Sequence, residues 1–148
     1  MSEMTVRPLE PADRAEWRRM WTGYLGFYRA TVDEPVYDTA FERMLGGEPR
    51  DFSGLVALVG GAPAGLAHYL FHRHGWKLGD VCYLQDLWVE PRFRGAGVGA
   101  ALIRAVYAAA DAAGAPDVYW LTAEDNAPAR RLYDRVGRLT PFVKYQRA

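Results

Sequence analysis

The stretch "RFRGAGVG", residues 92–99, sets three glycines at alternate positions after two arginines and directly before the apolar run "AALIRAVYAAADAAG". The glycines have no Cβ atoms, so the backbone N–H groups there can approach a ligand closely. The first N–H groups of a helix lack intrahelical acceptors, and the helix end carries about half a positive charge, which suits a phosphate. A tight turn alone explains the glycines but not Arg92 and Arg94. The pattern predicts a phosphate-binding loop at the start of a helix.

Two common phosphate-binding motifs fit this loop poorly. A nucleoside-triphosphate P-loop needs Gly-Lys-Ser/Thr after the glycines, and none follows. Gly95, Gly97 and Ala100 satisfy the spacing of a dinucleotide fingerprint, and Glu124 follows at about the distance expected of a ribose-binding acid. That fold needs further βαβ units after the fingerprint, however, and only about two dozen residues follow Glu124. A nucleotide-binding oxidoreductase is the weakest of the alternatives.

Hydrophobic spacing predicts helices and strands on both sides of the loop. Two β-type runs that meet at Gly60-Gly61 predict an antiparallel hairpin, and Pro91 ends the next β-type run. Asn126 suits the N-cap of a helix that ends at Gly137. This order of elements indicates an α/β fold, a mixed sheet with helices on its faces. Strands are expected at residues 5–9, 53–73 (the hairpin), 80–90, 117–125 and 140–147, and helices at about 11–25, 36–45, 98–114 and 126–137.

Composition narrows the class of protein. A chain of 148 residues, half of them hydrophobic, suits one compact domain. Eighteen basic and eighteen acidic residues cancel, so no positive field favours a nucleic acid. Cys82 is the only cysteine and cannot form an internal disulfide, and no apolar segment approaches the length of a membrane span. We expect a soluble cytoplasmic protein with no nucleic-acid or membrane partner.

The loop resembles that of a known family. "RGAGVG" matches the Q/R-x-x-G-x-G/A loop of the GNAT (Gcn5-related) N-acetyltransferases, with Arg94, Gly97 and Gly99 in the defining places. The likeness extends to "YLQDLWV" before the loop and "YWLTAEDNAPARRLYDRVG" after it, and it is strongest to the small single-domain branch of diamine acetyltransferases and Hpa2-like proteins. The resemblance implies the GNAT acyl-CoA N-acyltransferase fold, a central mostly antiparallel sheet flanked by helices, in a single domain over residues 1–148.

The resemblance also implies how the cosubstrate, acetyl-CoA, is bound. The loop amides meet its pyrophosphate, and the backbone of Leu87 and Val89 pairs with the pantetheine arm as an added strand. Asn126 matches an asparagine that often contacts the coenzyme, and Tyr133 falls beside the coenzyme's sulfur. The cofactor-binding residues expected on this basis are Leu87, Trp88, Val89, Arg94, Gly95, Ala96, Gly97, Val98, Gly99, Ala100, Asn126 and Tyr133.

Acetyl transfer to an amine needs a proton acceptor and a proton donor. A lysine-like amine has a pKa of about 10.4, so its deprotonation at neutral pH costs about 4–5 kcal/mol. The resemblance implies that Tyr133 protonates the leaving thiolate. In this branch a glutamate often stands where the chain has Gln85, whose amide cannot act as a base. We therefore expect Asp86 to take the amine's proton, directly or through water, or to hold the amine's charge, and the alternative is that Asp86 is a structural acceptor. Strand alternation puts Gln85 and Asp86 on opposite faces unless a bulge intervenes.

Two histidines are reserve bases. His68 and His72 alternate onto one face of their strand, although an isolated strand histidine is more often merely hydrogen-bonded. Their spacing resembles a metal-binding pair, but no third ligand completes it, and we expect no metal site. Cys82 would sit early in its strand, which disfavours a covalent acetyl-cysteine route.

Substrate selection is expected in the first fifty residues. Asp33 and Glu34 stand near the aromatic-rich "WTGYLGFY", a combination that suits a cationic amine, although a solvated acidic loop explains these charges equally well. Together with Gln85 they are the expected substrate contacts. The predicted function is transfer of the acetyl group of acetyl-CoA to a primary amine, of a small molecule or a lysine side chain, by direct attack in a ternary complex. The alternative is a noncatalytic acyl-CoA-binding or sensing module of the same fold. By analogy with the family we expect a homodimer.

Overall fold

The computed structural model describes residues 3–148, and the strands in this range form one sheet in the order β1-β2-β3-β4-β5. Neighbouring strands from β1 to β4 are antiparallel, whereas β5 lies parallel to β4. This confirms the predicted mixed, mostly antiparallel sheet. The hairpin turns at Gly60 and Gly61, both of which have positive φ. The strands are β1 (Met4–Pro8), β2 (Ser53–Val59), β3 (Ala62–His72), β4 (Val81–Val89) and β5 (Val118–Tyr119).

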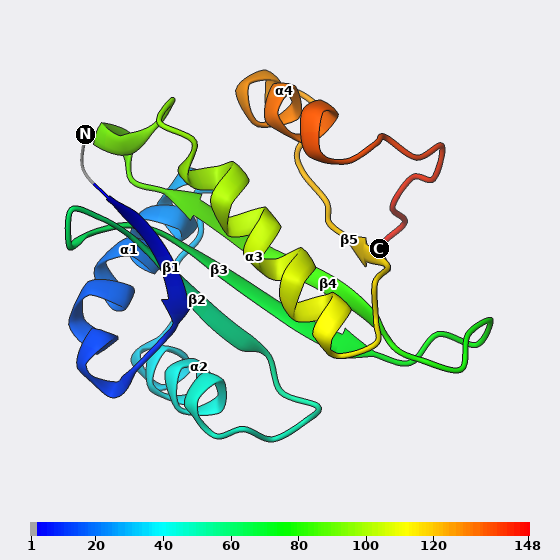
Figure 1. Cartoon of the computed structure of the whole chain (residues 1–148), viewed down its shortest axis with the longest axis horizontal. Helices are drawn as coiled ribbons and strands as arrows, with labels where there is room; N and C mark the ends of the chain where they lie inside the picture. The colour runs from blue at the N-terminus through cyan, green and yellow to red at the C-terminus, as the bar shows by residue number, and fades with distance from the viewer. Residues whose placement is uncertain (1–2) are drawn as a thin grey trace.

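Helices cover both faces of the sheet. Figure 1 shows α3 crossing the front of the sheet, α1 and α2 behind it, and α4 standing beyond β5. The helices are α1 (Arg14–Phe27), α2 (Glu34–Leu45), α3 (Val98–Ala112) and α4 (Ala127–Val136), with short 3₁₀ turns at Pro11–Asp13 and Pro91–Phe93.

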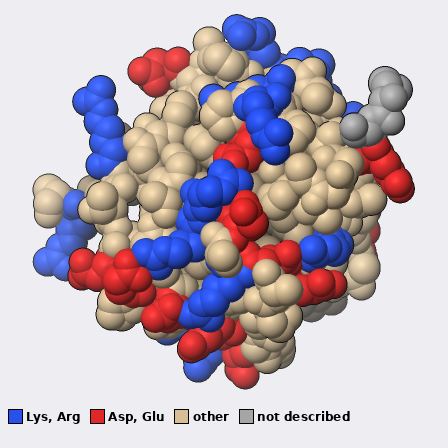
Figure 2. Space-filling model, turned by 90° about the vertical axis from the view of Figure 1, so that its left-hand side faces the viewer, with Lys and Arg blue, Asp and Glu red and all other residues tan. Residues whose placement is uncertain are grey.

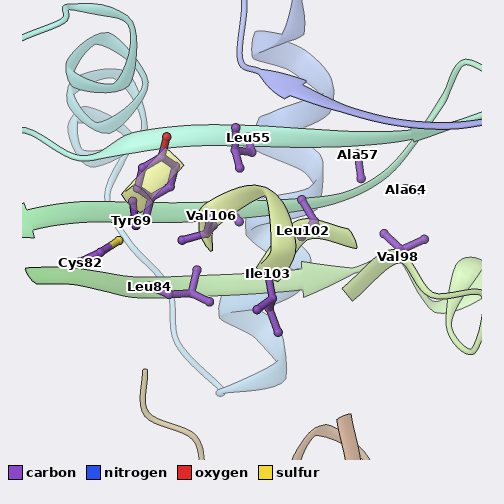
Figure 3. Packing of buried hydrophobic residues seen from close by; sticks show 12 residues of the cluster. Leu55, Ala57, Ala64, Tyr69, Cys82, Leu84, Val98, Leu102, Ile103 and Val106 are labelled. Atoms are coloured by element: carbon purple, nitrogen blue, oxygen red, sulfur yellow. The ribbon is translucent and has the colours of Figure 1, made fainter. Parts of the chain in front are cut away.

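The sheet separates two hydrophobic clusters. On the α3 face, Leu102, Ile103 and Val106 are fully buried over the middle strands, where Leu55 and Leu84 meet them (Figure 3). Their spacing along α3 turns one apolar stripe toward the sheet. Burial of each such side chain contributes roughly 1.5–3 kcal/mol to folding. This face therefore fixes α3, and with it the glycine loop, against β4.

On the rear face the second cluster joins α1 and α2 to the sheet. Trp17 and Met20 of α1 and Phe41 of α2 are buried against Leu66 of β3 and Trp88 of β4. The indole rings of Trp17 and Trp21 stack with their centroids 5.3 Å apart. The rear cluster thus places an aromatic wall beside the middle of β4.

β4 changes face at Gln85. The β3–β4 ladder pairs Leu84 and Asp86 with consecutive residues of β3 and skips Gln85, which is therefore the extra residue of a β-bulge. Leu84 packs toward α3, whereas Trp88 packs toward α1 and α2, although an unbroken strand would turn both to the same face. The bulge leaves Gln85 exposed and Asp86 buried on the rear face.

Two sequence predictions about the C-terminal strands are wrong. The strand expected at 117–125 is reduced to the two residues of β5, and residues 140–147 form no strand. The apolar side chains of the last segment are instead largely exposed, with Phe142 at 84% and Tyr145 at 92%. A β-strand needs a neighbour to hydrogen-bond with, and the described chain offers this segment none.

The surface charges are mixed in sign. On the face drawn in Figure 2, Lys and Arg side chains alternate with Asp and Glu in a band. Ion pairs such as Arg7–Asp13 and Arg14–Asp38 account for part of this mixing. Within the described residues, no helix is long and apolar enough to cross a membrane.

Candidate active site

The glycine loop has the geometry of an anion-binding turn. Gly95 and Gly97 have φ values of 82° and 87°, and a Cβ atom at either position would point into open space. The first intrahelical bond runs from the N–H of Ala101 to the carbonyl of Gly97, so the preceding N–H groups of the helix start are available to a ligand. At Gly99 a Cβ would lie 2.9 Å from Leu132 of α4, which requires glycine for close packing.

Arg94 links this loop to the end of β4. Its Nε donates to the carbonyl of Val89 at 3.1 Å, and its guanidinium lies 4.9 Å from the ring centroid of Trp88. Trp88 itself is buried and donates its indole N–H to Glu90. The side chain of Trp88 therefore belongs to the rear core, and its backbone pairs with Leu66 of β3, so Trp88 itself is not placed to meet a cofactor.

Half of β4 has an open edge. β5 pairs with β4 only through Cys82 and Tyr83, and beyond Tyr83 the chain segment after β5 turns away. Among the described residues, the β4 edge from 84 to 89 has no strand partner on this side. Its unpaired peptide groups include those of Leu87, while the carbonyl of Val89 is covered by Arg94. The fork between β4 and the segment after β5 suits an extended, amide-bearing ligand.

A narrow pocket of about 20 Å³ lies in this fork. We call it the fork pocket. Tyr133 of α4 reaches it, and its ring meets Trp120 edge to face at 5.5 Å. Burial, with a smaller contribution from Tyr28, raises the pKa of Tyr133 to about 12, so the phenol keeps its proton at neutral pH. The residues lining the fork pocket are Tyr24, Tyr28, Leu84, Gln85, Leu87, Trp120, Leu121 and Tyr133.

Two further groups flank the fork. The side chain of Asn126 accepts a hydrogen bond from the N–H of Ala129 at 3.4 Å, which confirms it as the N-cap of α4. Within the described part of the chain, the hydroxyl of Thr122 is the buried side-chain oxygen that lacks a hydrogen-bond partner. Thr122 follows Leu121, which lines the fork pocket, and its hydroxyl lies close to the phenol of Tyr28.

Asp86 lies at the centre of a buried hydrogen-bond network. One oxygen, Oδ2, is 2.8 Å from Nδ1 of His68, and it also accepts from the indole N–H of Trp21 at 3.3 Å. The Nε2 of His68 accepts in turn from the indole N–H of Trp17 at 2.9 Å. His68 is 2% exposed and Asp86 7%. The network fixes the carboxylate through Oδ2, and the phenol of Tyr24 also approaches this carboxylate.

The same network fixes the protonation of His68. An indole N–H is only a donor, so Nε2 of His68 must be the acceptor and Nδ1 must carry the proton given to Asp86. A second proton on Nε2 would break the bond from Trp17. His68 is therefore held as a neutral positioning group for Asp86.

A larger cavity of about 470 Å³ opens on the rear face beside Asp86. We call it the α2 pocket. Gln85 lines both this pocket and the fork pocket, so the bulge residue stands where the two meet. The residues lining the α2 pocket are Trp21, Val32, Pro35, Val36, Thr39, Ala40, Arg43, Phe52, His68, Gln85 and Asp86.

Residues 16–137 match the family described as "Acetyltransferase (GNAT) family". The chain belongs to this family. The match covers most of the described chain, including the glycine loop and Tyr133, and it makes the protein an acetyltransferase with acetyl-CoA as its cosubstrate.

Several relatives of this GNAT acetyltransferase have been named. The D-amino-acid N-acetyltransferase HPA3 of Saccharomyces cerevisiae is 37% identical over 145 residues, which is 97% of this chain and 90% of that protein. The thialysine N-epsilon-acetyltransferase of Caenorhabditis elegans is 28% identical over 89 residues, 60% of this chain and 55% of that protein. Among solved structures, the aminoglycoside N-acetyltransferase AAC(6')-Iy in complex with CoA has a TM-score of 0.85 at 20% identity, with 100% of this chain and 96% of that chain covered. This last likeness concerns the fold.

The predicted cofactor residues of the acetyltransferase converge on one region. The loop from Gly95 to Ala100 and the open edge of β4 share one side of the sheet with α4, and Tyr133 lines the fork. Val98 is buried in the front cluster, so only its backbone faces the loop. The bulge that would let Gln85 and Asp86 act on one site is present.

The acidic substrate residues are not brought to either pocket. Glu34 is paired with Arg18 of α1, whose guanidinium also lies 4.0 Å from the ring centroid of Tyr37. Asp33 precedes α2 and is exposed. Neither carboxylate lines the α2 pocket, although their neighbours Val32 and Pro35 do. The reserve base His72 lines neither pocket. Its Nε2 lies 2.7 Å from the hydroxyl of Tyr119.

Several pocket residues have no local signal in the sequence. Trp17 and Trp21 are buried, and their N–H groups also position His68 and Asp86. Arg43 lines the α2 pocket from the last turn of α2. The spacing of Trp17 and Trp21 by one helical turn indicates a shared face, but only the tertiary fold shows that this face meets Asp86.

Proposed function

We propose that this acetyltransferase transfers the acetyl group of acetyl-CoA to the primary amine of a small molecule by direct attack in a ternary complex. The observation that carries the proposal is the meeting of the two pockets at Gln85. The fork pocket then receives the thioester and the α2 pocket the amine. Each reactant enters from its own side of β4, so both can be bound at once.

Asp86 takes the amine's proton in this scheme. Its Oδ2 is held by His68 and Trp21, and the carboxylate lines the α2 pocket beside Gln85. The free amine nitrogen attacks the thioester carbon, a C–N bond forms, and the C–S bond breaks. Because Asp86 is buried, its negative charge attracts an ammonium strongly, which draws the amine to the base. Gln85 orients the reacting groups through its amide.

Tyr133 returns a proton to the departing thiolate. Its pKa is raised to about 12 by burial, so the phenol is a donor throughout the neutral range. Burial and the nearby charge of Asp86 also raise the pKa of Tyr24, which keeps a second neutral phenol in the fork pocket. The nitrogen loses a second proton as the amide forms, which restores the phenol of Tyr133 through water, and the proton taken by Asp86 leaves with solvent, so one ammonium and one thioester give one amide, one thiol and one proton.

The chain's own groups provide for the cosubstrate. The N–H groups at the start of α3, with Arg92 and Arg94 nearby, suit a pyrophosphate. The open edge of β4 at Leu87 suits the amides of a pantetheine arm, and the hydroxyl of Thr122 offers a further hydrogen bond. Asn126 flanks the same fork at the start of α4.

Thiol release from acetyl-CoA against a panel of amines tests this function. The panel spans amino acids, polyamines and lysine peptides, with binding of desulfo-CoA measured alongside. Amine-dependent release supports the proposal. Tight binding of the coenzyme analogue with no release for any amine refutes it and favours a noncatalytic acyl-CoA-binding module.

We also propose that two copies form a homodimer through the C-terminal segment. Leu139, Phe142, Val143 and Tyr145 are largely exposed, and Leu121 near the open end of β5 is exposed too. Several exposed apolar side chains within one short segment suit an interaction site. Light scattering on the whole chain is expected to give twice the monomer mass, and replacing Phe142 and Tyr145 by serine is expected to give the monomer. The cytoplasmic location stays a prediction from the sequence.

A further inference from the structure

The carboxylate of Glu90 is buried but takes no part in the proposed acetyl transfer. Glu90 directly follows β4 and is 9% exposed. Its Oε2 accepts a hydrogen bond from the indole N–H of Trp88 at 2.9 Å, and its Oε1 is paired with the guanidinium of Arg19 on α1. Arg19 is also paired with Glu16, one turn earlier on α1, at 2.8 Å. Both oxygens of Glu90 are thus occupied within the protein, and one of them holds the ring of Trp88.

The ring of Trp88 joins α1 to the glycine loop. The backbone of α1 packs so closely against it that a Cβ atom on Gly23 would lie 3.0 Å from Cζ2 of Trp88. The guanidinium of Arg94 lies 4.9 Å from the ring centroid of Trp88. Among aromatic rings an indole attracts a cation most strongly, and more so when the ring is buried, as it is here. The hydrogen bond to Glu90 fixes the indole, and with it the surface that Arg94 contacts.

Arg94 is anchored in a way that leaves the outer edge of its guanidinium free. Its Nε donates to the carbonyl of Val89 at 3.1 Å, whereas its two terminal nitrogens make no hydrogen bond or ion pair with any described residue. The terminal nitrogens of a guanidinium have four N–H donors, which can bind a phosphate through two parallel hydrogen bonds. Arg94 therefore offers a phosphate-binding edge three residues before Gly97.

Arg92 differs from Arg94 although both belong to the same loop. The guanidinium of Arg92 lies 4.4 Å from the ring centroid of its neighbour Phe93, and it has no ion-pair partner in the part of the chain that the structure describes. Its contact is therefore with its own turn, not with β4. A side chain that is already fixed loses less conformational freedom on binding than a mobile one. Of these two arginines, Arg94 is the one that the fold preorganises.

We propose that Trp88 and Glu90 are positioning residues for the coenzyme, because they hold Arg94 against β4 with its terminal N–H groups directed at the phosphates. This inference rests on the part of the proposed function that places the pyrophosphate at the glycine loop. Trp88 and Glu90 act through Arg94 and do not touch the coenzyme themselves. Arg19 completes the arrangement, since it neutralises Glu90, whose negative charge would otherwise repel a phosphate.

A double-mutant cycle on desulfo-CoA binding, measured by calorimetry, tests the inference. Arg94→Ala is expected to weaken binding about 10- to 100-fold, as loss of charged hydrogen bonds predicts. Trp88→Leu is expected to weaken it about three- to tenfold when Arg94 is present, as loss of a cation–π contact predicts, and to have no effect in the Arg94→Ala background. Trp88→Phe keeps a ring but cannot bond to Glu90, and its affinity is expected to lie between those of the wild type and Trp88→Leu.

A matched core variant separates positioning from folding. Trp88 lies in the rear cluster, and so does Phe41, which is 1% exposed and belongs to α2. Phe41→Leu is expected to lower the melting temperature as Trp88→Leu does, but to leave the affinity for desulfo-CoA unchanged. Circular dichroism and thermal melting check the fold of each variant.

A surface variant makes the test independent of core packing. The side chain of Arg19 is half-exposed, so Arg19→Gln is expected to fold normally while it leaves the charge of Glu90 unpaired. Arg19→Gln is expected to weaken desulfo-CoA binding about threefold. Arg14→Gln removes a guanidinium from the same helix, where it pairs with Asp38, and is expected to leave the affinity unchanged. With any amine that is acetylated, KM for acetyl-CoA is expected to follow these affinities while kcat stays the same.

The outcomes separate this inference from the proposed function. If Trp88→Leu weakens binding equally with and without Arg94, if Phe41→Leu weakens it as much, or if Arg19→Gln acts no more than Arg14→Gln, the inference is wrong while acetyl transfer stands. If the cycle behaves as expected but no amine releases thiol, acetyl transfer fails and the inference stands. If the wild-type chain does not bind desulfo-CoA, both fail.

Discussion

The fork pocket and the α2 pocket share Gln85 but are built from different kinds of groups. The fork pocket is lined by neutral side chains, among them the phenols of Tyr24, Tyr28 and Tyr133, and it borders unpaired backbone of β4. The α2 pocket is lined by charged and apolar side chains, with Asp86 fixed by a buried network. The fork pocket thus offers main-chain groups of β4 beside neutral side chains, whereas the α2 pocket offers charged and apolar side chains.

The difference suits the ligands that the proposed function assigns to the two pockets. A cosubstrate that never changes can be held by peptide groups, which any sequence supplies once the strand edge is open. An acceptor with its own charges needs complementary side chains, and a buried carboxylate is stable only when hydrogen bonds satisfy it. The bulge at Gln85 allows both, because it ends the front-facing register of β4 and sends Asp86 to the rear.

Removal of the charge of Asp86 is expected to cause the largest fall in kcat. Asp86→Asn keeps the shape and the acceptor oxygen for His68, so the fold survives, but an amide cannot take a proton. We expect kcat to fall by about 10²- to 10⁴-fold, the usual range for a general base, with unchanged binding of desulfo-CoA. Steady-state thiol release and calorimetry measure the two quantities.

A compensating variant sharpens this test. Gln85→Glu places a carboxylate at the meeting point of the two pockets. In the Asp86→Asn background it is expected to restore part of kcat. Near-normal activity of Asp86→Asn alone between about pH 6 and pH 9 would remove Asp86 from the role of base, since that range spans the region where an amine remains mostly protonated.

Loss of the proton donor Tyr133 in the fork pocket is expected to lower kcat less than loss of Asp86. A thiol has a pKa of about 8.5, so a thiolate leaves readily and needs less help than an amine needs in losing its proton. Tyr133→Phe is therefore expected to lower kcat by about 10- to 100-fold. Tyr28→Phe, which alters another phenol of the same pocket, is the matched control and is expected to have a smaller effect.

The pH profile provides an independent check on Tyr133. Burial raises its pKa to about 12, so the phenol is protonated below that value and is lost as an acid only as the pH rises through it. We expect the wild-type rate to rise as the amine deprotonates. Below about pH 11 we expect the wild-type profile to have no falling limb that is missing from the profile of Tyr133→Phe. A falling limb near pH 9 that disappears in Tyr133→Phe would contradict this role.

Alanine substitutions at Gly97 and Gly61 distinguish a glycine that serves coenzyme binding from one that serves only a turn. Gly97 and Gly61 have φ values of 87° and 82°, and neither has an atom within 4 Å of an added Cβ. An alanine in this left-handed region costs roughly 1–2 kcal/mol at either site, which lowers the melting temperature by about 2–8 °C. Only Gly97→Ala is expected to weaken coenzyme binding, by about tenfold for about 1.4 kcal/mol. Equal affinities for the two variants would show that the loop serves the fold alone.

The parts of the fold that sequence predicts are those with local causes. The hairpin at Gly60 and Gly61, the glycine loop and the cap at Asn126 each depend on residues within a few positions of one another. The segment from 140 to 147 has a strand-like pattern as well, but a strand also needs a partner, which no local pattern supplies. Its prediction as a strand was wrong for that reason.

The candidate site also has residues that a local motif predicts and residues that only the tertiary fold brings together. Tyr133 and the loop were found because their motif is contiguous with the elements that position them. The network of Trp17, Trp21 and His68 around Asp86 depends on a helix, a hairpin and a bulge meeting in space, and so does the place of Arg43. Conversely, Glu34 has the right charge for a cation site, yet its nearest partner is Arg18, which neutralises it.

The smallest expected effect on activity belongs to Cys82, which lines neither pocket. Its side chain is 0% exposed, and burial raises the pKa of its thiol to about 11. At pH 8 only about one thiolate in 10³ is then present, which is too little for a nucleophile that competes with an amine held at Asp86. Cys82→Ala is expected to keep kcat, at a stability cost of about 1 kcal/mol for the small cavity it leaves. Thiol reagents are expected to label the wild-type chain only after denaturant is added. Rapid labelling of the folded chain, or a folded Cys82→Ala variant without activity, would mean that acetyl transfer passes through a covalent cysteine intermediate and that the two pockets do not act on both reactants together.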